Sequence, residues 1–94
     1  MPILGTFQQQ PDEVLDYDFD FSTYLPTLDT LVSVSATADA GITLGDTVIS
    51  PTGKFIKQWV RGGTAGMAYK VEITATTAQG RVKQIEFKIK IREY

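Results

Sequence analysis

The stretch that decides the fold is YKVEITATTAQGRVKQIEFKIKI, residues 69–91. In each half of it, apolar residues occupy every second position: Tyr69, Val71, Ile73 and Ala75, then Ile85, Phe87, Ile89 and Ile91. Alternation with period two predicts two strands, each with one buried and one solvent-facing side. Gln79-Gly80 between them predicts a hairpin turn. Because Val82 falls on the opposite parity from Ile85, we also expect a β-bulge near Lys83-Gln84.

Strand-like patterns also fill the rest of the chain. Apolar residues alternate with aspartate or serine over residues 15–21 and 31–37, and residues 54–60 are strand-like. Residues 42–49 contain Gly45-Asp46, which predicts either two short strands or one interrupted strand. Turn-forming residues separate these segments, and no amphipathic helix is visible. The chain is therefore expected to be all-β, with six to eight antiparallel strands.

The glycine-rich run at 61–66, followed by Tyr69, is similar to the tyrosine corner of immunoglobulin-like domains. In such a corner the hydroxyl bonds to backbone a few residues upstream; alternatively, Tyr69 is simply a large strand former on a buried face. We expect an immunoglobulin-like or fibronectin-III-like β-sandwich over residues 14–94. Pro2 and Pro11 favour an extended N-terminal arm over residues 1–13.

Composition limits the possible functions. The chain has 94 residues and a net charge of −2, with no cysteine and no histidine. Disulfides, thiolate or imidazole metal sites and the commonest general base are thereby excluded. The acidic balance argues against nucleic-acid binding. No signal peptide and no apolar run of membrane-spanning length is visible, so we expect a soluble chain made in the cytoplasm. No nucleophile has a plausible base, so we expect no enzymatic activity and no cofactor.

Three carboxylates, Asp16, Asp18 and Asp20, have the D-x-D-x-D spacing that opens a calcium loop. Phe21 stands where that loop needs glycine, and Thr27 stands where it needs glutamate. The solvent face of a strand explains the spacing better. A carboxylate pair for glycoside hydrolysis is not favoured, because a chain of 94 residues leaves little room for a substrate cleft beside its core. Gly62-Gly63 is not followed by the helix that a phosphate-binding loop needs.

Two further features suggest surface roles. If the first and last strands are neighbours, Asp16, Asp18 and Asp20 face the cations of residues 88–92 in a cross-strand charge ladder; the alternative is that both faces are simply solvated. Trp59 shares an outer face with Phe55 if Ile56 and Val60 point into the core, and is buried in the opposite register. An exposed Trp59 is a candidate partner contact.

Two blocks, PDEVLDYDFDFS (residues 11–22) and WVRGGTAGMAYKVEITATTAQGRVKQIEFKIKI (residues 59–91), resemble the fibre–tail adaptors of tailed bacteriophages. The resemblance implies a non-enzymatic virion protein at the neck or tail, made in the host cytoplasm and present in several copies around a symmetry axis. Its implied partners are other virion proteins, namely tail or neck subunits and fibres, with no nucleic acid or membrane.

Within that interpretation, the arm is expected to dock on a neighbouring virion protein by adding to a sheet edge. The candidate partner-binding residues are Phe7, Gln8, Gln9, Gln10 and Trp59. Two other functions stay open: a capsid decoration protein, and an immunoglobulin-like module that binds carbohydrate or a cell surface. The second would need several exposed aromatic side chains on one face.

Overall fold

The computed structural model describes residues 3–25 and 28–93, and within them the chain forms a two-layer β-sandwich. Seven strands and one turn of 3-10 helix follow one another in these described residues: β1 (Ile3–Gln9), β2 (Val14–Asp20), η1 (Ser22–Tyr24), β3 (Leu31–Ala38), β4 (Ile42–Ile49), β5 (Phe55–Gly62), β6 (Ala68–Thr77) and β7 (Val82–Ile91). The all-β architecture predicted from the sequence is confirmed.

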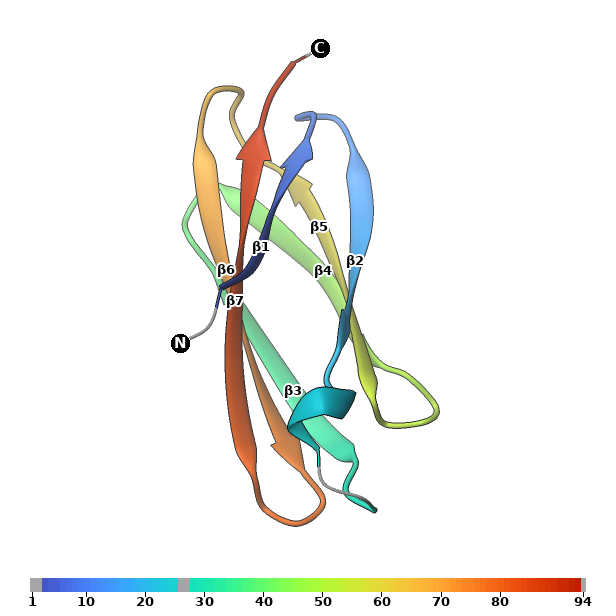
Figure 1. Cartoon of the computed structure of the whole chain (residues 1–94). Helices are drawn as coiled ribbons and strands as arrows, with labels where there is room; N and C mark the ends of the chain where they lie inside the picture. The colour runs from blue at the N-terminus through green and yellow to red at the C-terminus, as the bar shows by residue number, and fades with distance from the viewer. Residues whose placement is uncertain (1–2, 26–27, 94) are drawn as a thin grey trace.

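One sheet has four strands in the order β1-β7-β6-β3, and the other has three in the order β2-β5-β4 (Figure 1). Every pairing is antiparallel except β1 with β7, which is parallel. The prediction of antiparallel strands throughout was therefore wrong at this one pair.

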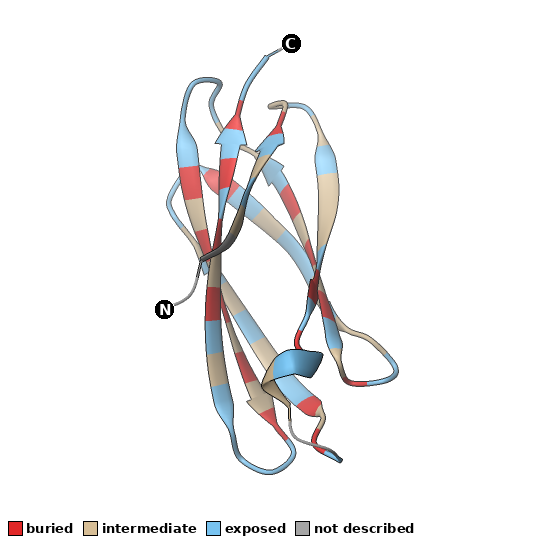
Figure 2. Cartoon of the chain, viewed as in Figure 1, coloured by how far each residue is buried: buried red, intermediate tan, exposed pale blue. Residues whose placement is uncertain are grey.

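The β6–β7 hairpin forms as its alternation predicts. All four apolar positions of β6 from Tyr69 to Ala75 and all four of β7 from Ile85 to Ile91 are buried (Figure 2). The expected bulge at Lys83-Gln84 is absent, because the pairing runs without a shift from Ala68 opposite Lys90 to Thr76 opposite Val82. Val82 instead faces outward and is 63% exposed. A single exposed apolar residue beside a turn needs no bulge to explain it.

The sequence predicted an extended arm over residues 1–13, but residues 3–9 lie within the sandwich as a strand. Residues 1 and 2 lie outside the described residues. In β1, Phe7 is opposite Ile89 and Gln9 is opposite Ile91. The Phe7 ring lies 4.7 Å from the Tyr17 ring and 5.9 Å from the Phe87 ring. Proline beside an edge strand is compatible with pairing along the strand itself, so Pro11 did not mark a linker.

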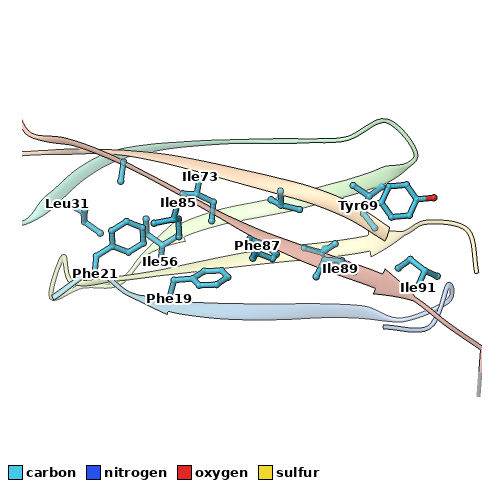
Figure 3. Close-up of a cluster of buried hydrophobic side chains, with 14 residues drawn as sticks. Phe19, Phe21, Leu31, Ile56, Tyr69, Ile73, Ile85, Phe87, Ile89 and Ile91 are labelled. Atoms are coloured by element: carbon cyan, nitrogen blue, oxygen red, sulfur yellow. The ribbon is translucent and has the colours of Figure 1, made fainter. Parts of the chain in front are cut away.

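The expected charge ladder between the first aspartates and the last cations does not form. β2 pairs with β5 in the three-stranded sheet, whereas β7 lies in the other sheet between β1 and β6. The inward side chains of the two strands decide this, because Phe19 and Phe87 meet across the core with ring centroids 4.7 Å apart (Figure 3). Asp16 instead pairs with Lys57 at 3.3 Å.

β4 is one strand interrupted by a bulge, which decides between the two possibilities for residues 42–49. Its register against β5 shifts between Leu44 and Thr47. The buried Gln58 side chain holds the bulge, since its amide donates to the Gly45 carbonyl (3.2 Å) and its Oε1 accepts from the Thr47 hydroxyl. Glycine is required at 45 because a Cβ there would lie 2.9 Å from the Cβ of Trp59.

The tyrosine corner predicted at Tyr69 is present. The Thr64 backbone N–H donates to the Tyr69 hydroxyl at 2.9 Å, and the ring is buried. Gly63 makes the close approach possible: its φ is +94°, and a Cβ would lie 2.6 Å from Cγ1 of Ile91. The hydrogen bond fixes the passage from β5 in one sheet to β6 in the other.

At the opposite end of the sandwich, the buried Asp29 carboxylate joins the loop before β3 to the β6–β7 hairpin. It accepts hydrogen bonds from the backbone N–H of Gln79 (3.2 Å) and from the Arg81 guanidinium (3.0 Å). Burial alone would raise the pKa of Asp29, but hydrogen bonds from Thr77, Gln79, Arg81 and Thr30 hold that pKa below its usual value. The carboxylate is therefore charged whenever the fold is intact near neutral pH.

Candidate partner-binding site

Two of the predicted contact residues, Phe7 and Gln9, are used inside the domain. The Gln9 side chain is fully buried between the sheets. Its amide donates to the carbonyls of Glu13 and Val60, both at 2.9 Å, and its Oε1 accepts from the Tyr17 hydroxyl at 2.7 Å. Gln9 thus links β1 of one sheet to β2 and β5 of the other, and its side chain is not available to a partner.

The Tyr17 hydroxyl keeps its proton in this arrangement. Burial, together with the nearby carboxylates of Glu13 and Asp16, raises the pKa of that hydroxyl above its usual value. It therefore acts as the donor to Gln9 across the neutral pH range.

Gln8 and Gln10 lie closer to the surface. Gln8 is exposed on the outer side of the four-stranded sheet, opposite Lys90. Gln10 is partly buried in the turn between β1 and β2, where its N–H donates to Oε1 of Glu13 at 2.7 Å and its carbonyl accepts from the Glu13 N–H at 3.1 Å. Gln10 therefore helps to close the turn.

Trp59 lies on the outer side of the three-stranded sheet, as one of the two registers considered from sequence predicts. Ile56 and Val60 are completely buried, which turns Phe55, Lys57 and Trp59 outward. Phe55 is 43% exposed and Trp59 is partly exposed. The central strand β5 thus presents two aromatic side chains away from the core.

Neighbouring strands add aliphatic side chains beside these rings. Val14 of β2 is 55% exposed and Val48 of β4 is 47% exposed. Val14 is opposite Arg61 of β5, and Val48 is opposite Lys57. We call this surface the Trp59 face and define it by Val14, Asp16, Asp18, Val48, Phe55, Lys57, Trp59 and Arg61. The two valines could not be assigned to this face from sequence alone, because the bulge in β4 and the pairing of β2 decide which way they point.

Two shallow hollows lie on the Trp59 face. One, of about 260 Å³, lies between Val14, Asp46, Trp59 and Arg61. The other, of about 240 Å³, is lined by apolar atoms of Val48, Pro51 and Phe55 with Asp18 and Lys57 at its border. The Lys57–Asp16 ion pair lies between Trp59 and Phe55 along the sheet. An apolar centre with a polar rim is the arrangement common in protein–protein interfaces.

The three strand aspartates do not converge. Asp16 pairs with Lys57, Asp18 is exposed, and Asp20 accepts from the Ser22 N–H at 2.8 Å. The hydrogen bonds from Ser22 hold the pKa of Asp20 below its usual value. Within the described residues, no group of three acidic side chains lies close enough to hold a metal ion. No described helix is long and apolar enough to cross a membrane.

A family model for the podophage GP4 fiber-tail adaptor protein gp77 matches residues 9–90. The chain belongs to this family. The match includes the first block that carries the resemblance to fibre–tail adaptors and all but the last residue of the second. It also includes the intervening residues 23–58, which the resemblance did not reach. The Trp59 face lies within the matched region. A search of curated proteins found no match.

Membership of the family makes the chain a phage structural protein of the adaptor class, and adaptors bind other tail or fibre proteins.

Proposed function

We propose that this chain is a non-enzymatic virion protein that sits at the neck or tail and connects the tail to fibres or to neighbouring tail proteins. The family match over residues 9–90 carries this proposal. The two-layer sandwich, with its buried glutamines fully hydrogen-bonded, supports it as a rigid connector. Its site of action is the assembled virion, after synthesis in the host cytoplasm.

The Trp59 face is the proposed contact with a tail or fibre protein. Tryptophan and arginine are the residues that most often dominate binding energy at protein interfaces, and here Trp59 and Arg61 border the same hollow. Phe55 and Val48 supply apolar area in the second hollow. The surrounding aspartates and lysine would set the orientation of the partner more than the affinity.

Several copies are proposed to act together around the symmetry axis of the tail. A single contact of this size binds weakly, because each hollow exposes only a few apolar side chains. When many copies engage one assembly at once, the second and later contacts become effectively intramolecular, and attachment becomes durable.

We further propose that the sandwich is of the immunoglobulin-like type. The hydrogen bond of the tyrosine corner at Tyr69 supports this. So does the arrangement in two sheets, in which the connection from β3 to β4 passes from one sheet to the other.

Imaging of particles that carry a tagged copy of the chain tests the proposed location. Immunogold or cryo-electron label in a fixed ring at the neck or tail is the expected result. Label spread over the shell would make the chain a capsid decoration protein, and absence from particles would exclude a virion role.

The contact surface is tested by Trp59→Ala, with Val82→Ala as the matched control. Val82 is an apolar residue on the outer side of the other sheet, and at 63% exposure it is more exposed than the partly exposed Trp59. Trp59→Ala is expected to reduce incorporation into particles or attachment of fibres, while Val82→Ala leaves both unchanged. Circular dichroism of both variants shows whether the fold is intact. Equal incorporation of the two folded variants would remove the Trp59 face from the proposal.

A further inference from the structure

The four edge strands of the sandwich differ in how well they are protected against pairing with another chain. β1 and β3 end the larger sheet, and β2 and β4 end the smaller one. Each edge presents backbone N–H and C=O groups that a foreign strand can use. Proteins usually protect such edges with charged side chains, prolines, bulges or short strands.

Three of the edges carry such protection. β2 places Asp16, Asp18 and Asp20 at alternate positions along its length. β4 is broken by the bulge at Gly45 and Asp46. β1 is irregular between Ile3 and Thr6, and Pro11 follows shortly after the end of the strand. Pairing along any of these edges would meet repulsion or a break in register.

β3 lacks these devices over almost its whole length. Its sequence, LVSVSATA, contains no charged residue, proline or glycine. Its register against β6 shifts only at the start, between Leu31 and Ser33, and is unbroken from Ser33 to Ala38. No other described strand pairs with its outer edge. Only the first residue is covered from the other sheet, where the Leu31 N–H donates to the Gly53 carbonyl at 2.9 Å. The remaining edge is regular, uncharged and rich in strand-forming residues.

We infer that β3 pairs with β3 of a second copy of this chain in antiparallel orientation, joining two four-stranded sheets into one. A twofold axis through the pair would make the interface self-complementary. Exposed Ser33, Ser35 and Thr37 would then face serine or threonine on the other copy, whereas the same geometry at β2 would set aspartates against aspartates.

Charges at the two ends of β3 agree with this pairing. Asp29, before the strand, is fully buried and hydrogen-bonded within its own chain, so it presents no charge to a partner strand. Asp39, after the strand, accepts from the Lys70 N–H at 2.9 Å and remains at the surface. Antiparallel pairing brings Asp39 of one copy toward the Leu31 end of the other. The Lys54 amine lies at that end, donating to the Asp29 carbonyl at 2.7 Å. In the proposed pair, Asp39 of one copy and Lys54 of the other would therefore lie at the same end.

Sedimentation velocity of the purified chain over a concentration series tests this inference, and it does not depend on the adaptor function. The wild type is expected to form a reversible dimer. Ser35→Lys places two like charges opposite each other at the centre of the pair and is expected to weaken dimerisation roughly fivefold or more. Gln84→Lys is the matched control, because it adds the same charge to the same outer row, two strands away from the edge.

Because the chain has no cysteine, Ser35→Cys gives a second, independent measurement. Mild oxidation is expected to produce a disulfide-linked dimer, whereas Thr43→Cys, which is exposed on the other sheet, stays monomeric. A wild type that is monomeric throughout, or a dimer equally sensitive to both lysine variants, would overturn the inference. The inference would also be overturned if the wild type were a monomer and Ser35→Lys prevented only its incorporation into particles. The edge of β3 would then bind a different virion protein.

Discussion

Replacement of Gln9 by leucine tests whether β1 is an integral part of the sandwich. Leucine has nearly the same volume but removes one acceptor and both amide donors. The Val60 carbonyl then loses its buried partner, and the Glu13 carbonyl and the Tyr17 hydroxyl lose theirs in a partly buried setting. An unsatisfied buried polar group costs about 1–3 kcal/mol, and the partly buried groups recover much of their loss from water. We expect Gln9→Leu to lower the free energy of unfolding by about 2–4 kcal/mol.

Thermal and urea unfolding followed by circular dichroism measure this change. For a domain of this size, the expected loss lowers Tm by roughly 10–25 °C. Thr6→Leu, at an exposed position on the outer side of β1, is the control and is expected to change stability by about 0.5 kcal/mol or less. Tyr17→Phe completes a double-mutant cycle, because its hydroxyl donates to Gln9. It should cost about 1 kcal/mol in the wild type and clearly less in Gln9→Leu. If Gln9→Leu were as stable as Thr6→Leu, residues 3–9 would behave as a free arm and the network would have no energetic role.

Three further predictions concern stability. Gly63→Ala should lower the free energy of unfolding by about 2–4 kcal/mol, because it combines a positive φ with a Cβ 2.6 Å from Ile91. Gly80 has a φ of +88° but open space around it, so Gly80→Ala should lower the free energy of unfolding by only about 1 kcal/mol in the same urea titration. Tyr69→Phe should lose about 1–2 kcal/mol, since the Thr64 N–H loses its acceptor, and hydrogen exchange at Thr64 should accelerate; unchanged exchange would contradict the role given to the corner. The pKa of Asp29 is lower in the folded chain than in the unfolded one. The stabilising effect of its carboxylate is therefore complete above the unfolded pKa, near 4, and disappears as the pH falls through the folded pKa. Asp29→Asn should flatten this acidic part of the curve of stability against pH, and parallel curves for the two proteins would refute the prediction.

Local patterns predicted most of the strands, because side-chain alternation depends only on which face of a strand is buried. β6 and β7 are the clearest examples, and the corner at Tyr69 followed from the glycines before it. The partners of each strand depend instead on contacts between distant residues. Charge complementarity suggested β2 beside β7, but aromatic packing between the sheets, seen at Phe19 and Phe87, placed these strands in different sheets.

Buried polar residues were the least predictable part of the candidate site. Gln9 and Gln58 are of a residue type that is normally exposed, and nothing in the neighbouring sequence signals that both are completely buried. Their hydrogen-bond partners lie on other strands, so only the assembled sandwich reveals them. Trp59 was more tractable, because the alternation of Ile56 and Val60 offered only two registers.

The parallel pairing of β1 with β7 has a mechanical consequence. Because the two strands run in the same direction, a force that pulls the Ile3 end of β1 away from the Ile91 end of β7 acts along both strands in opposite senses. The backbone bonds between them are then loaded in shear and must break together, whereas an antiparallel terminal pair pulled from its open end would separate one bond at a time. Tension applied between these two strands therefore meets its main resistance at the first pairing that must break, before the core of the sandwich is exposed.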